Sequence, residues 1–220
     1  MNTIADYHFG TAEAEHTSDY LWDHVLSLLR VHDAKRVLDL GCGNGAFCAR
    51  LAEAGFNVTG CDPSIEGIDH ARRRELSGAQ FERIGVEDDP SDRLGTFDAV
   101  VSLEVIEHLF FPRRLPRFAA RVLRPGGRLI ISTPYHGYLK DLALALTNKW
   151  ELHHSPLWDG GHIKFWTRST LTQLLREEGF DVADFRGVGR LPYLWKSMIV
   201  GSRLKEGSIA RSFPLESFPR

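Results

Sequence analysis

The sequence predicts an α/β protein built around a doubly wound, mostly parallel β-sheet. Two observations carry this prediction. Strand-like apolar segments alternate with helix-like segments along most of the chain, and a glycine-rich turn joins the first strand to the next helix. Such alternation implies right-handed crossovers and a sheet that is covered on both faces. Ligands of these sheets bind beyond the carboxyl ends of the strands, so functional residues are expected there.

The individual elements follow from local patterns. Apolar residues recur at helical spacing over 17–31, and Ser18 or Asp19 could cap that helix. Strands and helices then alternate, and 124–127, which reads Arg-Pro-Gly-Gly, is expected to be a turn. Strands are expected over 36–40, 57–61, 80–84, 97–103, 128–132, 180–186 and 198–202, and helices over 45–54, 64–76, 113–123 and 168–178.

Composition indicates one globular domain, which we place at 1–202, followed by a loose polar tail over 203–220. The 220 residues are 43% hydrophobic and carry a net charge of −2, which gives no overall attraction to nucleic acid or anionic membrane. No apolar run approaches the roughly 20 residues of a membrane span, and we find no secretory signal. Three cysteines, an odd number, argue against a disulfide framework and favour a cytoplasmic location.

The segment Val37–Gly45 reads as a strand that ends in a cofactor-binding turn with three glycines. One spacing, Gly41-x-Gly43-x-x-Ala46, matches the dinucleotide fingerprint and leaves NAD open as the cofactor. Asp62 ends the second strand and could hold the ribose hydroxyls of either NAD or S-adenosylmethionine. Asp39 would repel a pyrophosphate and suits a ligand with ammonium and sulfonium charges, unless it only caps the turn.

Four motifs at 36–132 resemble, in order, those of class I S-adenosylmethionine-dependent methyltransferases. They are Val37–Gly45, Gly60–Pro63, Phe97–Ser102 and Leu123–Leu129. The resemblance implies a Rossmann-like fold with seven strands, the last pair forming an antiparallel hairpin. It also implies that the glycines lie near the methionine part of the cofactor, Asp39 near its ammonium and Asp62 at its ribose. The turn at 85–88 would border the adenine, with either Glu87 or Asp88 at its edge. The cofactor-binding residues expected from it are Asp39, Gly41, Gly43, Gly45, Asp62, Val86, Glu87 and Ser102.

A second group of polar residues follows the fourth strand. Glu104, Glu107 and His108 have the spacing of one helical face and could ligate a divalent metal, although acidic residues also favour helix N-termini. With the later segment 161–168, which contains His162, this group resembles two kinds of methyltransferase. These are the ubiquinone-biosynthesis O-methyltransferases and the small-RNA 2′-O-methyltransferases. The resemblance implies a Mg, Mn, Fe or Zn ion on Glu104, Glu107, His108 and His162. Without a metal, His108 or His162 is the expected catalytic base.

The segment 133–166 is unusually aromatic and is expected to form either a lid over an apolar acceptor pocket or a small satellite core. The N-terminal segment, with Tyr7, His8, Phe9 and Tyr20, is expected to close over the cofactor.

The favoured function is O-methylation of a small hydroxylated acceptor, with a divalent metal as an option. A 2′-O-methyltransferase of RNA 3′ ends is the main alternative, and basic clusters at 72–74 and 113–117 keep it open, although nucleic acid is not the expected partner. An NAD-dependent oxidoreductase and a non-catalytic cofactor-binding relative are further alternatives. The oligomeric state is left open.

Overall fold

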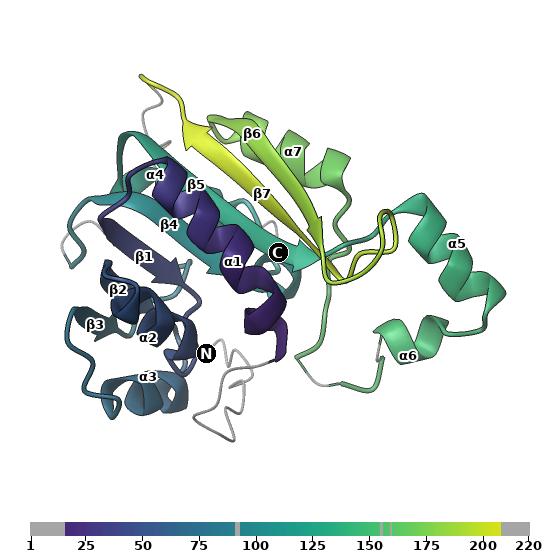
Figure 1. Cartoon of the computed structure of the whole chain (residues 1–220), viewed down its shortest axis with the longest axis horizontal. Helices are drawn as coiled ribbons and strands as arrows, with labels where there is room; N and C mark the ends of the chain where they lie inside the picture. The colour runs from purple at the N-terminus through teal and green to yellow at the C-terminus, as the bar shows by residue number, and fades with distance from the viewer. Residues whose placement is uncertain (1–15, 91–92, 155, 159, 208–220) are drawn as a thin grey trace, which may run out of the picture.

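The computed structural model describes residues 16–90, 93–154, 156–158 and 160–207, and it contains one seven-stranded sheet in the order β3-β2-β1-β4-β5-β7-β6 (Figure 1). The strands from β3 to β5 run parallel, whereas β7 pairs antiparallel with both β5 and β6. The predicted sheet with an antiparallel C-terminal hairpin is therefore confirmed. The strands are β1 (Arg36–Leu40), β2 (Asn57–Cys61), β3 (Ala79–Glu82), β4 (Phe97–Leu103), β5 (Leu123–Pro134), β6 (Phe180–Val188) and β7 (Ser197–Leu204).

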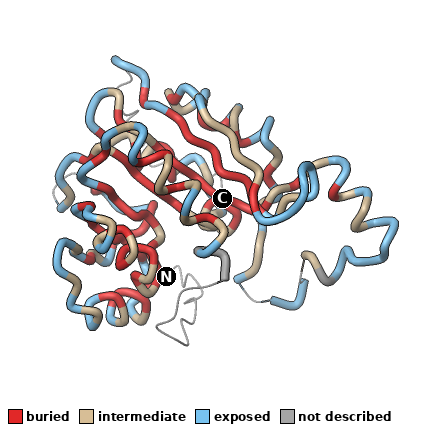
Figure 2. Tube along the Cα trace, in the orientation of Figure 1, coloured by how far each residue is buried: buried red, intermediate tan, exposed pale blue. Residues whose placement is uncertain are grey.

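Helices cover both faces of the sheet. One layer holds α1 (His16–Val31), α2 (Ala46–Glu53) and α3 (Ile65–Arg72), and the other holds α4 (Arg114–Val122) and α7 (Arg168–Glu177). Neighbouring residues of a strand point to opposite faces, so Val37 packs with the first layer and Leu38 with the second. Because both faces are covered, the central strands are buried along most of their length (Figure 2).

Several predicted boundaries were wrong, among them that of the third strand, expected at 80–84 and observed at Ala79–Glu82. The third helix, expected to reach residue 76, ends at Arg72. The expected turn at 124–127 belongs to β5, where the register jumps between the Phe97–Leu123 and Ala99–Arg128 pairs and Gly126 adopts a φ of +73°. The residues between Leu123 and Arg128 therefore form a bulge-like irregularity within β5. The last strand continues through Leu204, two residues into the predicted tail, and 208–220 lie outside the described residues.

The segments that follow β4 and β5 are the least regular. A short 3₁₀ turn, η1 (Ile106–His108), comes after β4, and two helices, α5 (Tyr138–Leu146) and α6 (Trp150–His154), project beyond the sheet edge (Figure 1). The expectation that Glu104, Glu107 and His108 share one helical face was wrong. The turn starts only at Ile106, and Glu104 has a left-handed φ of +55°.

Candidate functional site

The loop between β1 and α2 has the backbone geometry expected of a cofactor turn. Gly41, Gly43 and Gly45 have φ values of +88°, +51° and +74°, in the region that residues with a Cβ rarely adopt. The peptide nitrogens of Gly41 and Cys42 donate to the carbonyl of Cys61 at the end of β2, at 2.7 and 3.0 Å. The loop therefore turns directly above the carboxyl ends of the first two strands.

At two of these glycines, the space left by the missing Cβ is filled by protein side chains. A Cβ at Gly41 would collide with Cγ2 of Val105, and one at Gly45 would lie 2.8 Å from the Cβ of Ala71. These glycines are thus required by backbone conformation and by close packing within the protein. Val105 precedes η1, so the cofactor loop packs directly on the segment that carries the acceptor-side residues.

The two acidic residues predicted at the cofactor are both buried at strand ends. Asp39 accepts a hydrogen bond from the Cys48 thiol at 3.2 Å, and burial, with a contribution from the Asp62 charge, raises its pKa to about 7. Asp62 accepts from the peptide nitrogens of Gly43 at 3.0 Å and Ser64 at 2.8 Å. Asp62 therefore also holds the loop closed. Burial disfavours the charged form of Asp39, and a cationic ligand such as S-adenosylmethionine would favour it.

The remaining cofactor candidates are engaged in the fold. Val86 is buried in the hydrophobic core, and the Ser102 hydroxyl donates to the Leu40 carbonyl at 2.7 Å. Glu87 forms an ion pair with Arg114 at 2.6 Å, whereas Asp88 accepts from the Gly85 peptide nitrogen and closes its own turn. The contact of the 85–88 turn with adenine, and that of Ser102 with the cofactor, remain predictions.

Three of the four predicted metal ligands come together. Ligand atoms of Glu107, His108 and His162 all lie within 4.8 Å of one another, and these form the one such group found among the described residues. The η1 turn supplies the first two. His162 is brought close because the peptide nitrogens of Ile163 and Lys164 both donate to the Glu107 carbonyl, at 2.9 and 3.0 Å.

Glu107 carries the clearest electrostatic signature of the group. Its side chain is buried, Oε2 accepts from the Thr133 hydroxyl at 3.0 Å, and Oε1 is buried without a hydrogen-bond partner. Burial, reinforced by the nearby Glu104 charge, raises the pKa of Glu107 well above its usual value. A buried carboxylate oxygen without a partner is costly, and a cation between Glu107 and the two imidazoles would relieve that cost.

The two histidines are suited to ligation in their neutral form. Nδ1 of His108 lies 2.9 Å from the Gly160 carbonyl, so this nitrogen carries the proton and the lone pair of the neutral ring is on Nε2. The rings of His108 and His162 are 4.9 Å apart. Burial and the neighbouring His108 lower the pKa of His162 to about 4, so its ring is neutral at pH 7.

The fourth predicted ligand, Glu104, lies outside this group. Its Oε1 accepts from the Ser132 hydroxyl at 2.8 Å and its Oε2 from the Ser197 hydroxyl at 3.2 Å. It contributes to the site through its charge, which raises the pKa of Glu107.

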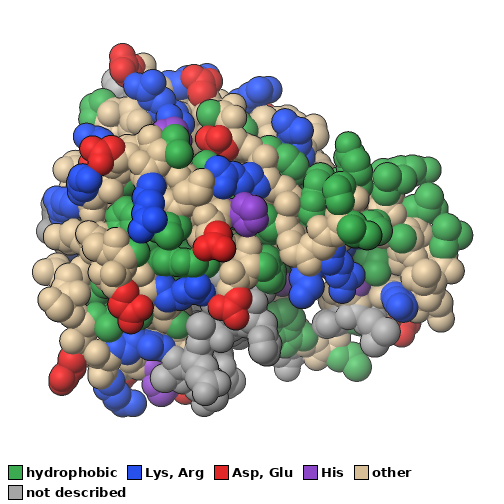
Figure 3. All heavy atoms as spheres, viewed as in Figure 1, with side chains coloured by type: hydrophobic (Ala, Val, Ile, Leu, Met, Phe, Trp, Pro, Cys, Tyr) green, Lys and Arg blue, Asp and Glu red, His purple; other side chains and the backbone are tan. Residues whose placement is uncertain are grey.

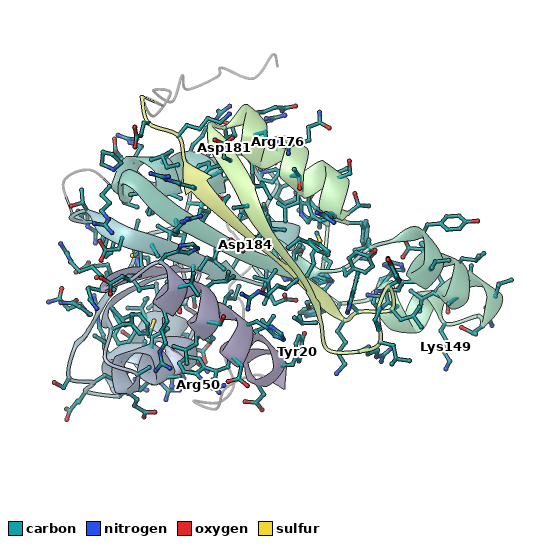
Figure 4. All side chains as sticks on the ribbon, turned by 45° about the horizontal axis from the view of Figure 1, so that its top comes forward. Tyr20, Arg50, Lys149, Arg176, Asp181 and Asp184 are labelled. Atoms are coloured by element: carbon teal, nitrogen blue, oxygen red, sulfur yellow. The ribbon has the colours of Figure 1, made fainter. Side chains whose placement is uncertain are left out.

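The segment 133–166 includes α5 and α6, which project from the sheet as a lobe. Among the described residues, neither hydrophobic cluster of the core includes a side chain from α5 or α6. The side chains of Tyr138, Leu146 and Trp150 are largely exposed, and Figure 3 shows this lobe as a mostly hydrophobic surface. Figure 4 labels Lys149 at its outer corner, between the two helices. Tyr7, His8 and Phe9, expected to close over the cofactor, lie outside the described residues.

Sequence reasoning assigned no role to three histidines of this lobe. The structure gathers His136, His153 and His154, whose ring centroids lie 5.0–5.6 Å apart. Burial lowers the pKa of His136 to about 3, and Oδ1 of Asp141 lies 3.7 Å from its Nδ1. Nothing in the spacing could have revealed this cluster, because it depends on how α5 and α6 fold back.

Four arginines of the basic clusters at 72–74 and 113–117, which left RNA open as a partner, make contacts within the protein. Arg113 and Arg117 form ion pairs with Glu178 at 3.0 and 2.8 Å. Arg72 donates to the Phe81 carbonyl, and Arg74 to the Asn44 carbonyl in the cofactor loop.

Comparison with known proteins agrees with this geometry. A family model described as a methyltransferase domain matches residues 14–184. The chain is 30% identical over 161 residues to the ubiquinone biosynthesis O-methyltransferase of Aromatoleum aromaticum, covering 72% of this chain and 69% of that protein. Its counterpart in Aeromonas salmonicida is 31% identical, with coverage of 72% and 68%.

Solved structures establish the same fold. Magnesium protoporphyrin IX methyltransferase from Synechocystis with bound S-adenosylhomocysteine (SAH) aligns with a TM-score of 0.63 at 21% identity, over 83% of this chain and 81% of that one. A putative methyltransferase complexed with the Trm112 activator of Haloferax volcanii aligns with a TM-score of 0.66 at 19% identity, with coverage of 86% and 91%.

The fold and the cofactor loop define a class I S-adenosylmethionine-dependent methyltransferase. The chain belongs to the methyltransferase domain family, whose model covers most of its length. The oxidoreductase alternative is thereby set aside. None of the helices in the described part of the chain has the length and apolar character needed to cross a membrane.

Proposed function

We propose that this protein is a metal-assisted O-methyltransferase that methylates a hydroxyl group of a small acceptor. One observation carries the proposal. Glu107 has a buried carboxylate whose Oε1 is without a hydrogen-bond partner, and a carboxylate oxygen of this residue lies within 4.8 Å of ligand atoms of His108 and His162, next to the loop that would hold the cofactor. The names of the relatives, ubiquinone biosynthesis O-methyltransferases, support oxygen as the methylated atom.

The reaction itself needs alignment more than acid–base power. The acceptor oxygen attacks the methyl carbon, the new C–O bond forms as the C–S bond breaks, and SAH leaves. The hydroxyl proton passes to solvent water, so that the products are the methyl ether, SAH and a proton. A divalent ion bound to Glu107, His108 and His162 would lower the pKa of the acceptor hydroxyl and orient its oxygen.

The chain's own residues divide the remaining work. Asp39 provides negative charge for the cationic cofactor, and Asp62 holds the loop and faces its ribose. With a pKa of about 4, His162 is a weak base at pH 7, so its chemistry favours metal ligation over proton abstraction. The paired arginines of the 72–74 and 113–117 clusters favour a small-molecule acceptor over RNA.

The test is methyl transfer from labelled S-adenosylmethionine to catechol and to a set of small polyols, with and without a chelator. The expected result is product with the wild type plus Mn²⁺ or Mg²⁺, and at least a tenfold loss with chelator or in Glu107→Gln. Glu53→Gln, at an exposed helix position, is the matched control and should retain activity. Full activity of Glu107→Gln in the presence of chelator would refute the metal role.

A further inference from the structure

Glu104 occupies a position that its residue type alone does not explain. It is one of five non-glycine residues with positive φ among those described, at +55°, and it directly precedes the segment that carries Val105, Glu107 and His108. Such a conformation is unfavourable for a residue with a Cβ and persists only where surrounding contacts impose it.

Those contacts include four hydrogen bonds to two serines. The peptide nitrogen of Glu104 lies 3.1 Å from both the carbonyl and the hydroxyl oxygen of Ser132, and its carboxylate accepts from Ser132 and Ser197. Both serines are buried, on β5 and β7 respectively. The turn after β4 is therefore fastened to the ends of the two neighbouring strands in sheet order.

The same chain of bonds reaches the N-terminal helix. The hydroxyl oxygens of Tyr20 and Ser197 are 3.0 Å apart. Because the single hydroxyl hydrogen of Ser197 goes to Glu104, Tyr20 is the donor in this pair. Figure 4 labels Tyr20 toward the N-terminal end of α1.

The fastened turn touches both halves of the site. On one side, Val105 packs against the α-carbon of Gly41 in the cofactor loop, as the collision of a Cβ there shows. On the other side, Glu107 and His108 belong to the candidate metal centre. A change in the backbone at Glu104 would therefore shift the cofactor loop and the metal-binding carboxylate together.

We infer that Glu104 is a positioning residue. Through its hydrogen bonds to Ser132 and Ser197, it fixes the position of the cofactor loop relative to the candidate metal centre. The metal half of this inference rests on the proposed function, whereas the cofactor half rests on the family alone. A direct role of Glu104 as a metal ligand makes different predictions and is tested by the same variants.

The experiment measures binding of SAH and of Mn²⁺ by calorimetry to the full chain. The variants are Ser132→Ala, Ser197→Ala and Glu104→Gln. The matched control is Ser202→Ala, a buried serine of β7 whose hydroxyl donates to the Leu129 carbonyl, away from the turn. Thermal unfolding is recorded for each variant, so that a general loss of stability is recognised.

If Glu104 positions the turn, each of the three variants weakens SAH binding about threefold and Mn²⁺ binding roughly tenfold, the usual scale for residues that orient metal ligands. Ser202→Ala changes neither. Loss of Mn²⁺ binding in Glu104→Gln alone, with both serine variants unaffected, would overturn the inference in favour of a metal ligand. Unchanged binding of both ligands, with only lower unfolding temperatures, would overturn it in favour of a scaffold role.

The two proposals fail in distinguishable ways. A wild type that does not bind Mn²⁺ refutes the metal centre, and the SAH measurements then decide the role of Glu104. If one serine variant does not fold, Glu104→Gln, which keeps the side-chain volume, gives the answer.

Discussion

Thr133 donates its hydroxyl hydrogen to Oε2 of Glu107 at 3.0 Å, while Oε1 of the same carboxylate is buried and has no hydrogen-bond partner. Ser132, the residue before Thr133, makes the equivalent bond to Glu104. Two consecutive hydroxyls at the end of β5 thus hold the two acids that follow β4. The difference between them is that both oxygens of Glu104 are bonded to serines, whereas Glu107 keeps one oxygen available for a ligand.

Glu107→Gln should increase the stability of the metal-free protein. Burial raises the pKa of Glu107 in the folded state above its ordinary value of 4.5. As the pH rises above 4.5, the carboxyl ionises more readily in the unfolded chain than in the folded one, so the folded state loses stability. The variant cannot ionise, and we expect its free energy of unfolding at pH 8 to exceed that of the wild type by about 1–2 kcal/mol. Urea unfolding at pH 5 and pH 8 checks this. The gain should shrink at pH 5, and equal stability of the two proteins at pH 8 would contradict an uncompensated buried charge.

Binding of Mn²⁺ should strengthen as the pH rises from 6 to 8. A metal requires ionised Glu107, whose raised pKa means that the proton must be displaced on binding. The pKa of His162 is about 4, so its ring is already neutral over this range and adds no pH dependence. Calorimetry in buffers of different ionisation enthalpy measures both the affinity and the protons released. His162→Asn should weaken binding at every pH without changing the slope, and a pH-independent affinity of the wild type would count against Glu107 as a ligand.

Asp39→Asn should weaken cofactor binding about tenfold or more. The carboxylate pKa of about 7 predicts that the affinity of the wild type for S-adenosylmethionine falls as the pH drops below 7, because the protonated acid no longer attracts the ligand's positive charge. If Asp39 faces the ammonium, S-adenosylmethionine and SAH lose affinity equally, since both carry that group. Cys48→Ala removes the thiol hydrogen bond that lowers this pKa, and should move the midpoint of the pH profile upward. If the affinity for S-adenosylmethionine does not change with pH in the wild type, in Asp39→Asn or in Cys48→Ala, Asp39 lies away from the ligand.

The sheet and the cofactor loop were predictable because their signals are local. Alternating apolar residues, the glycines at 41, 43 and 45 and the acids at strand ends each report on a few neighbouring positions. The number of strands and the antiparallel C-terminal hairpin came from the family resemblance, whereas the strand order was not predicted. Even within this part, the sequence did not reveal that Val105 and Ala71 occupy the space beside two of the glycines.

The acceptor side was less predictable because its geometry depends on contacts distant in sequence. The spacing of Glu104, Glu107 and His108 suggested a helical face, but hydrogen bonds from Ser132 and Ser197 hold Glu104 in a left-handed conformation before the turn begins. Only Glu107, His108 and His162 then meet. Because one fold can host many chemistries, the role of such residues has to be argued from their own geometry and not from the sheet.

Gly41→Ala should destabilise the protein by about 2–4 kcal/mol and weaken SAH binding, whereas Gly55→Ala should cost only about 1 kcal/mol. Both glycines have left-handed φ values, +88° and +92°, so the conformational cost of a Cβ is the same at each. They differ in surroundings, because a Cβ at Gly41 collides with Val105 and one at Gly55 meets nothing within 4 Å. Urea unfolding of both variants therefore isolates the packing of the cofactor loop on the segment before η1. Adding Val105→Ala to Gly41→Ala should recover part of the loss. If the double variant is destabilised by the sum of the two single-variant losses, the two residues are not in contact.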